Sequence, residues 1–187
     1  QFVLGAISGT KAVAVFAVAI QLQTMYMQFS SAISTVFLPK VTGMVATGKN
    51  DKELSDLFVK TGRLQFIVMA FILSGFVIFG KQFIILWAGN AYLEAYAMCI
   101  LFFIALIIPL IQNLGITILQ ARNQMKFRSL LYIGISAIAL VLQIVFAKKW
   151  GGIGCAVAIS GVLILGQGFI MNIYYAKTFK MEIGRMF

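Results

Sequence analysis

Long apolar runs alternate with short polar stretches along this chain. Such runs predict membrane-spanning helices, because about 20 apolar residues in a helix cross the hydrocarbon core of a bilayer. We therefore predict an all-α fold, a polytopic transmembrane helical bundle that forms a single domain over residues 1–187. About five complete spans and the end of a sixth are expected, at residues 1–9 (partial), 12–38, 64–80, 93–120, 130–147 and 153–176.

The first complete span, residues 12–38, carries a polar stripe. Its polar residues recur at steps of three or four, which places them on one face of a helix; they are Gln21, Thr24, Gln28, Ser31 and Thr35. Polar side chains that face lipid are costly. We therefore expect this face, called the first stripe below, to meet other protein or a water-filled cavity.

A second set of polar residues follows Pro109 inside the span expected at 93–120: Gln112, Asn113, Thr117 and Gln120. A proline in a membrane helix favours a kink, which is tolerated where protein or water satisfies the freed backbone. Pro39 is expected to end or kink the first complete span. We interpret seven of these polar residues as the lining of a substrate cavity: Gln21, Thr24, Gln28, Ser31, Gln112, Asn113 and Thr117. The alternative is that they only form hydrogen bonds between helices.

Residues 40–63 form the one long polar stretch and are expected to be a cytoplasmic loop. Asn50 followed by Glu53 has the spacing of a helix capping box. Apolar residues at 54, 57 and 58 would give the following short helix one apolar face. This helix could lie on the membrane surface or be an ordinary helical loop, and the sequence leaves both open.

Composition supports lipid as the solvent of this chain. Hydrophobic residues make up 61% and charged residues 11%, with a mean hydropathy of +1.00, whereas average soluble domains are about 45–50% apolar and ~25% charged. The net charge is +10. Eleven of the 15 Lys and Arg residues fall on one side of the expected spans. That side is predicted to be cytoplasmic, with the C-terminus on it, and the charge is attributed to topology rather than to nucleic-acid binding.

The sequence offers little to an enzyme mechanism. It has no His, and its five acidic residues give no pair with a base inside a span. The motifs GxGxxG, P-loop, HExxH and CxxC are absent. Cys99 and Cys155 lie far apart in apolar runs, where they are interpreted as small buried side chains. We expect no catalytic residue, no metal and no cofactor.

Several segments resemble one protein family. Five segments are similar to the C-terminal half of bacterial oligosaccharide flippases. They are LGAISGTKAVAVFAVAIQLQTMYMQFSSAISTVFLPKV, ELSDLF, QFIILWAG, LIIPLIQNLGITILQARNQMKFRS and KKWGGIGCAVA. These are polysaccharide biosynthesis (export) proteins of the multidrug/oligosaccharidyl-lipid/polysaccharide exporter superfamily. The resemblance covers nearly the whole chain.

The resemblance implies the second of two six-helix bundles around a central cavity, in the inner or plasma membrane of a bacterium. It further implies that the partners are the N-terminal half of a longer parent protein, the bilayer and an undecaprenyl-diphosphate-linked oligosaccharide, which is moved by alternating access. Cationic cavity residues of several family members face the diphosphate, but this chain has no Lys or Arg inside an expected span. A cation-coupled drug exporter of the same superfamily, and a non-transporting membrane scaffold or enzyme subunit, remain alternatives.

Overall fold

The computed structural model describes residues 2–47, 51–121 and 125–171, and these residues form helices without any strand. The prediction of an all-α protein is confirmed. The elements, in chain order, are α1 (Phe2–Ala46), α2 (Asp51–Trp87), η1 (Asn90–Tyr92), α3 (Ala95–Ile111), α4 (Asn113–Ala121), α5 (Lys126–Leu163) and the π-helix η2 (Ile164–Ile170).

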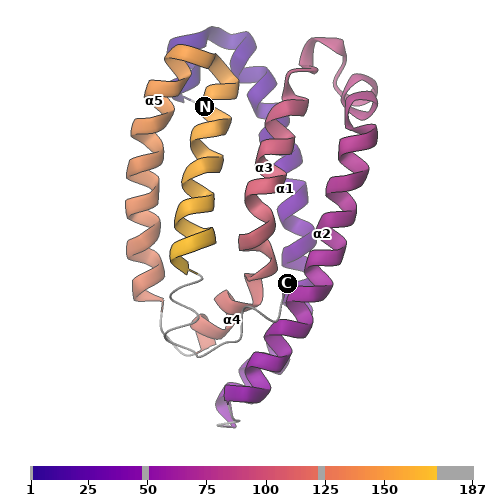
Figure 1. Ribbon diagram of the computed structural model, residues 1–187, viewed down its shortest axis with the longest axis vertical. Coiled ribbons are helices and arrows are strands. Elements are labelled where there is room, and N and C mark those ends of the chain that lie inside the picture. The colour runs from indigo at the N-terminus through magenta and orange to yellow at the C-terminus, as the bar shows by residue number, and fades with distance from the viewer. Residues whose placement is uncertain (1, 48–50, 122–124, 172–187) are drawn as a thin grey trace.

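Helix α1 holds the bundle together. It packs against α2, α3, α4 and α5, and the long helices lie side by side along one axis (Figure 1). Small and aromatic side chains of α1, among them Phe16, Ala19 and Tyr26, are buried in the main apolar core with residues of α2, α3 and α5. A second apolar cluster joins the end of α1 and the start of α2 to α4, through Val41, Phe58 and Leu114.

Within the described residues, three helical segments are long and apolar enough to cross a membrane: Gly9–Ala46, Lys52–Trp87 and Arg128–Gly168. A fourth span results if the bent pair Ala95–Ile111 and Asn113–Gln120 is counted as one. These lengths support a transmembrane protein.

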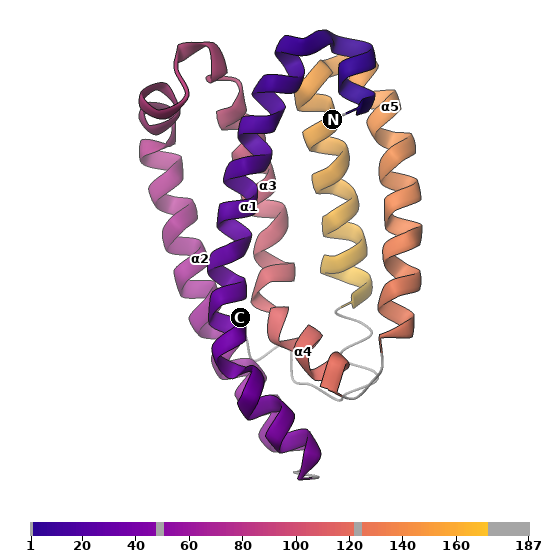
Figure 2. The same ribbon diagram turned by 180° about the vertical axis from the view of Figure 1, so that it is seen from behind.

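Helix α5 contains a break at Gly151, with φ 55° and ψ −132°. Figure 2 shows its two arms running side by side in opposite directions on either side of this turn. The arms occupy the region where separate spans were expected at 130–147 and 153–176; residues 172–176 lie outside the described residues. A total of about five spans stays a prediction.

Of the two outcomes expected at Pro39, an end of the helix is wrong, and a kink stays a prediction. Helix α1 continues past Pro39 to Ala46. The expectation of a loop over residues 40–63, with a separate surface helix, is corrected as well. Residues from Asp51 onward are the first turns of α2, which runs without interruption to Trp87. The apolar face at positions 54, 57 and 58 is buried against α1 and α4 instead of against a membrane surface.

Other predicted breaks occur near their expected places. Gly89 adopts φ 99° just after α2 ends, a conformation that glycine adopts easily, and so turns the chain between the spans expected at 64–80 and 93–120. Gly9, with φ 79°, bends the chain beside the break expected at Thr10 and Lys11. The bend expected at Pro109 falls three residues later, at Gln112, where α3 and α4 meet at 49°.

Candidate functional site

The first stripe lies on the outer face of α1, opposite the side that packs into the bundle. All five of its residues are exposed: Gln21, Thr24, Gln28, Ser31 and Thr35. The buried residues of the same helix include Ala19, Tyr26, Ser30 and Ser34. No described helix covers the stripe, and its contact with other protein or a water-filled cavity stays a prediction.

The outer faces of α2 and α5 have a different character. Exposed residues of α2 include Phe71, Ile78 and Leu86, and those of the first arm of α5 include Leu130 and Val141. Such large apolar side chains suit contact with lipid. Between residues 64 and 80 of α2 and between residues 130 and 147 of α5, the exposed polar side chains are Ser74 and Ser136, whereas residues 21–35 of α1 expose the five of the first stripe, beside the apolar Met25, Met27 and Phe29.

The five residues of the first stripe differ in how well they would tolerate lipid. The hydroxyl groups of Thr24 and Thr35 donate hydrogen bonds of 2.8 Å to the carbonyl groups of Ile20 and Ser31, one turn earlier in the same helix. Hydroxyl groups bonded in this way are compatible with an apolar environment. The amides of Gln21 and Gln28 have two donor hydrogens and an acceptor each and are exposed. Because of these two amides, the stripe needs a polar neighbour.

A buried polar cluster lies on the opposite face of α1, and it was not predicted from the sequence. Gln65 of α2 is 0% exposed, and its Nε2 lies 2.8 Å from Ser34 Oγ, 3.2 Å from Ser30 Oγ and 3.1 Å from the Ser30 carbonyl oxygen. Ser30 Oγ in turn donates to the carbonyl group of Leu110 at 2.7 Å. The cluster therefore links α1, α2 and α3 just before α3 breaks.

The signal for this cluster was the four-residue spacing of Ser30 and Ser34. Ser30 and Ser31 are adjacent and point about 100° apart around the helix. Spacing alone does not tell which side faces inward.

The described residues of the second polar set differ in exposure. Gln112 is buried at the bend between α3 and α4, Asn113 is half-buried and Gln120 is exposed; Thr117 lies in α4, and its side chain is outside the described ones. Gln112 lines a small polar pocket with Pro109, Arg128, Tyr132 and Gln167, among others. The cavity-lining role proposed for Gln112 beside the first stripe has no support in this arrangement.

Arg128 is the charged group of this small pocket. It lies in the first turn of α5, half-buried, and its Nη2 donates a 2.7 Å hydrogen bond to the hydroxyl group of Tyr132. Its guanidinium carbon also lies 4.9 Å from the centre of the Tyr132 ring, a cation–π geometry. Arg128 is thus held by its own helix.

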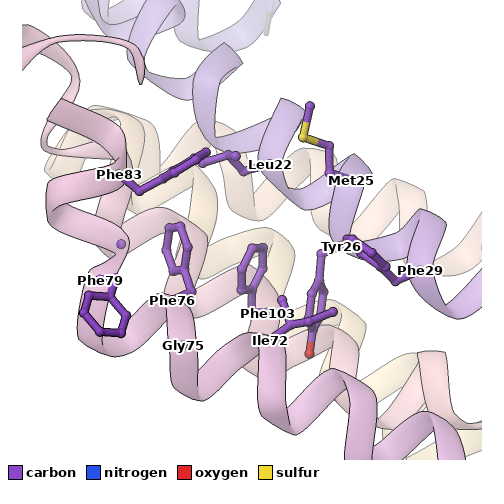
Figure 3. Close-up of a pocket in the computed structure, with 11 residues that line it drawn as sticks. Leu22, Met25, Tyr26, Phe29, Ile72, Gly75, Phe76, Phe79, Phe83 and Phe103 are labelled. Carbon is purple, nitrogen blue, oxygen red and sulfur yellow. The ribbon is translucent and has the colours of Figure 1, made fainter. Parts of the chain in front are cut away.

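An apolar groove of about 310 Å³ separates α1 from α2 (Figure 3). Its lining consists of aliphatic, aromatic and glycine residues of α1, α2 and α3: Leu22, Met25, Tyr26, Phe29, Ile72, Gly75, Phe76, Phe79, Gly80, Phe83 and Phe103.

Three neighbouring aromatic rings form the floor of this groove, one pair stacked and the other tilted. Figure 3 shows Phe76, Phe103 and Tyr26 in a row. The ring centres of Tyr26 and Phe103 are 4.2 Å apart, and those of Phe76 and Phe103 are 5.0 Å apart. The hydroxyl group of Tyr26 donates to the Met69 carbonyl group at 3.1 Å. The one hydroxyl group of the floor is therefore already hydrogen-bonded within the protein.

Charged side chains gather at the other end of α1 and α2. Lys40, Glu53, Asp56 and Lys60 line an open hollow of about 670 Å³ between the end of α1 and the start of α2. This end of the molecule extends beyond the other helices (Figure 1). Cys99 and Cys155 are buried, as expected.

Comparisons with known proteins give no relative: no protein-family model, curated protein or solved structure matches this chain.

Proposed function

We propose that this chain forms part of a membrane transporter that moves an undecaprenyl-diphosphate-linked oligosaccharide unit across a bacterial inner or plasma membrane by alternating access. The observation that carries the proposal is the exposed polar stripe of α1 between apolar outer faces of α2 and α5. The resemblance of the sequence to oligosaccharide flippases supplies the substrate class.

The chemistry of the stripe suits a sugar. The amides of Gln21 and Gln28 and the hydroxyl group of Ser31 can each donate and accept hydrogen bonds, and hydroxyl-rich solutes need such groups to replace their bonds to water. A water-filled cavity in front of α1 would also remove the cost of polar groups in lipid. In this proposal the N-terminal half of a longer parent protein provides the opposite cavity wall, and the two bundles rock against each other.

In this proposal the distribution of basic residues determines which end of the bundle faces the cytoplasm. The end of the bundle with Lys40, Lys60 and Arg63 faces the cytoplasm, because basic residues accumulate on that side. The chain then crosses the membrane several times, and its C-terminus is cytoplasmic. Transport requires no catalytic group, cofactor or metal from this chain.

Two alternatives make different predictions. A cation-coupled exporter of drugs would favour an acidic residue inside the membrane, and the expected spans contain none in their interior. A non-transporting scaffold would use the first stripe to bind another protein, so the amides of Gln21 and Gln28 would be covered instead of wet.

The test is translocation by the parent protein in liposomes, with a labelled undecaprenyl-diphosphate oligosaccharide and a cationic drug measured in parallel. The proposal predicts movement of the lipid-linked sugar and none of the drug. Movement of the drug alone would establish the exporter instead. With neither moving, the scaffold would be favoured, provided that the reconstituted protein is folded by circular dichroism.

The residue assignment is tested by Gln28→Leu, with Gln143→Leu on α5 as the matched amide control. We expect sugar translocation to fall in Gln28→Leu and to persist in the control at equal expression. Unchanged translocation in Gln28→Leu would remove this residue from the proposed cavity.

A further inference from the structure

A hollow of about 500 Å³ lies between α1 and the first turns of α2, within the volumes of roughly 300–1,000 Å³ that are usual for small-molecule sites. The residues of α2 that line it include, in order toward the start of the helix, Ile67, Leu64, Arg63, Lys60 and Asp56. Positions 56, 60, 63 and 67 follow each other at steps of four, three and four, which places them on one face of α2. Along this face the lining changes from apolar to basic and then to acidic.

The hollow lies where α2 crosses a boundary of the membrane. No charged residue occurs between Arg63 and Lys81, and this part of α2 is about 27 Å long at the rise of an α-helix, close to the ~30 Å of a hydrocarbon core. Lys60 and Arg63 therefore lie at the level of the lipid headgroups. Leu64 and Ile67 are exposed on the hydrocarbon side, so the hollow is open to bilayer lipid.

The order of charges in the hollow selects among lipid headgroups. Lys60 and Arg63 suit a phosphate group, whereas Asp56, about 6 Å beyond Lys60 along the helix, repels a second anion and attracts a cation. The neighbouring hollow adds Lys40 and Glu53, one charge of each sign. The headgroup that matches this order carries a phosphate near the hydrocarbon and a cation farther out.

Phosphatidylethanolamine has this arrangement. Its acyl chains, its phosphate and its primary ammonium group follow each other in the order of the lining, and the ammonium group has N–H donors for a carboxylate. Phosphatidylglycerol has the phosphate but no cation for Asp56, and phosphatidylcholine has a cation without an N–H group. The charges of the hollow therefore favour an ethanolamine headgroup over both of these.

Thr61 supplies an independent observation. It lines the same hollow and is 1% exposed, and its Oγ1 has no hydrogen-bond partner among the described residues. Threonine hydroxyl groups in helices can donate to the carbonyl group one turn earlier, as those of Thr24 and Thr35 do. A buried hydroxyl group without a partner is unfavourable. A phosphate oxygen in the hollow would supply the acceptor after a change of the Thr61 rotamer.

We propose that this hollow is a binding site for phosphatidylethanolamine, with the phosphate at Lys60 and Arg63 and the ammonium group at Asp56. The bound lipid joins the end of α1 to α2, because Phe37 of α1 also lines the hollow. The inference requires that α2 spans a membrane. It does not depend on what the parent protein transports.

The experiment uses the parent protein in nanodiscs of phosphatidylcholine, with a trace of phosphatidylethanolamine that carries a photoactivatable diazirine at the glycerol end of one acyl chain. We expect crosslinks to peptides that contain residues 56–67. Unlabelled phosphatidylethanolamine should reduce the crosslinks at a lower fraction of the bilayer than phosphatidylglycerol does.

Lys60→Gln should lower the crosslinking yield at limiting probe roughly two- to fivefold, which is the effect expected from an exposed ion pair. Lys60→Arg, which keeps the charge, should retain most of the yield. Lys52→Gln is the matched control, because Lys52 is an exposed residue of α2 that lines neither hollow.

Asp56→Asn should change the order of preference between the lipids. Without this carboxylate the ethanolamine headgroup loses its partner and phosphatidylglycerol is no longer repelled, so phosphatidylglycerol should compete at least as well as phosphatidylethanolamine. Glu94→Gln removes an exposed acidic residue just before α3 and should leave the preference unchanged.

Equal competition by the two lipids in the unmodified protein, or stronger competition by phosphatidylglycerol, would overturn the inference and make the hollow a contact for ordinary bilayer lipid only. So would the absence of crosslinks to residues 56–67, or a preference that both Lys60→Gln and Asp56→Asn leave unchanged. Both substituted side chains are exposed, and an unchanged Tm confirms that the variants fold. Because translocation of a lipid-linked sugar is measured separately, failure of the transport proposal would leave this site untouched.

Discussion

Gln65 is the residue on which the junction of α1, α2 and α3 depends most. It is fully buried, and its Nε2 faces three oxygen atoms of Ser30 and Ser34 at 2.8–3.2 Å. Its Oε1 has no hydrogen-bond partner among the described residues. Gln65→Leu keeps the apolar part of the side chain and removes all of these polar atoms.

The expected loss of stability in Gln65→Leu follows from the number of hydrogen bonds that Nε2 can donate. Nε2 carries two hydrogens, so at most two full hydrogen bonds are lost. Hydrogen bonds between membrane helices contribute on average about 0.6 and at most about 1.7 kcal/mol each. Removal of the unpartnered Oε1 offsets part of this loss. We therefore expect a destabilisation of about 1–2 kcal/mol, which for a protein of this size lowers Tm by roughly 2–8 °C.

The assay is thermal unfolding in detergent for Gln65→Leu, Ser34→Ala and the double variant. Because the two side chains are 2.8 Å apart, the double-mutant cycle should give a coupling energy of about 0.5–1.5 kcal/mol. Gln21→Leu on the exposed face should leave Tm unchanged. A Gln65→Leu variant as stable as the unmodified protein, with no coupling to Ser34, would refute the reasoning.

Two further predictions concern α5 and the π-helix η2 that continues its second arm. A Cβ atom at Gly166 would collide with Cδ1 and Cγ1 of Ile135, whose own Cβ lies 3.8 Å away. Gly166→Ala should therefore lower the free energy of unfolding by about 1–3 kcal/mol. Adding Ile135→Ala should restore part of that stability, as thermal unfolding would show. Gly151 has φ 55° at the turn between the arms, so Gly151→Ala should lower stability by about 1–3 kcal/mol while Gly134→Ala does not; equal effects at both glycines would contradict this turn.

The sequence predicted the apolar helices and several breaks, because these depend on local properties. Hydropathy identified the long helices, and the polar gap between two apolar runs agrees with the turn after Trp87. The ends of helices were harder to predict. Pro39 does not stop α1, and the charged residues before Arg63 belong to α2, because burial of Val41, Leu54 and Phe58 in a shared cluster extends both helices.

The candidate site could be predicted only in part. Periodicity found the first stripe, since spacing at three and four residues depends on one helix alone. It could not show that Gln112 is buried at a bend while Gln21 faces outward, because that depends on how α3 packs. The cluster at Gln65 and the groove at Gly75 need two helices each, so neither has a signature in a single segment.

The most direct test of the account is the contact of the first stripe with water. Single cysteines would replace Gln21 or Gln28, with Leu130→Cys and Ile133→Cys on the apolar outer face of α5 as controls. Cys99 and Cys155 would be changed to alanine in all variants. In membranes, a water-soluble thiol reagent should modify the two stripe cysteines much faster than either control cysteine, because the reactive thiolate forms in water. Stripe cysteines as unreactive as those at 130 and 133 would contradict a water-filled cavity in front of α1.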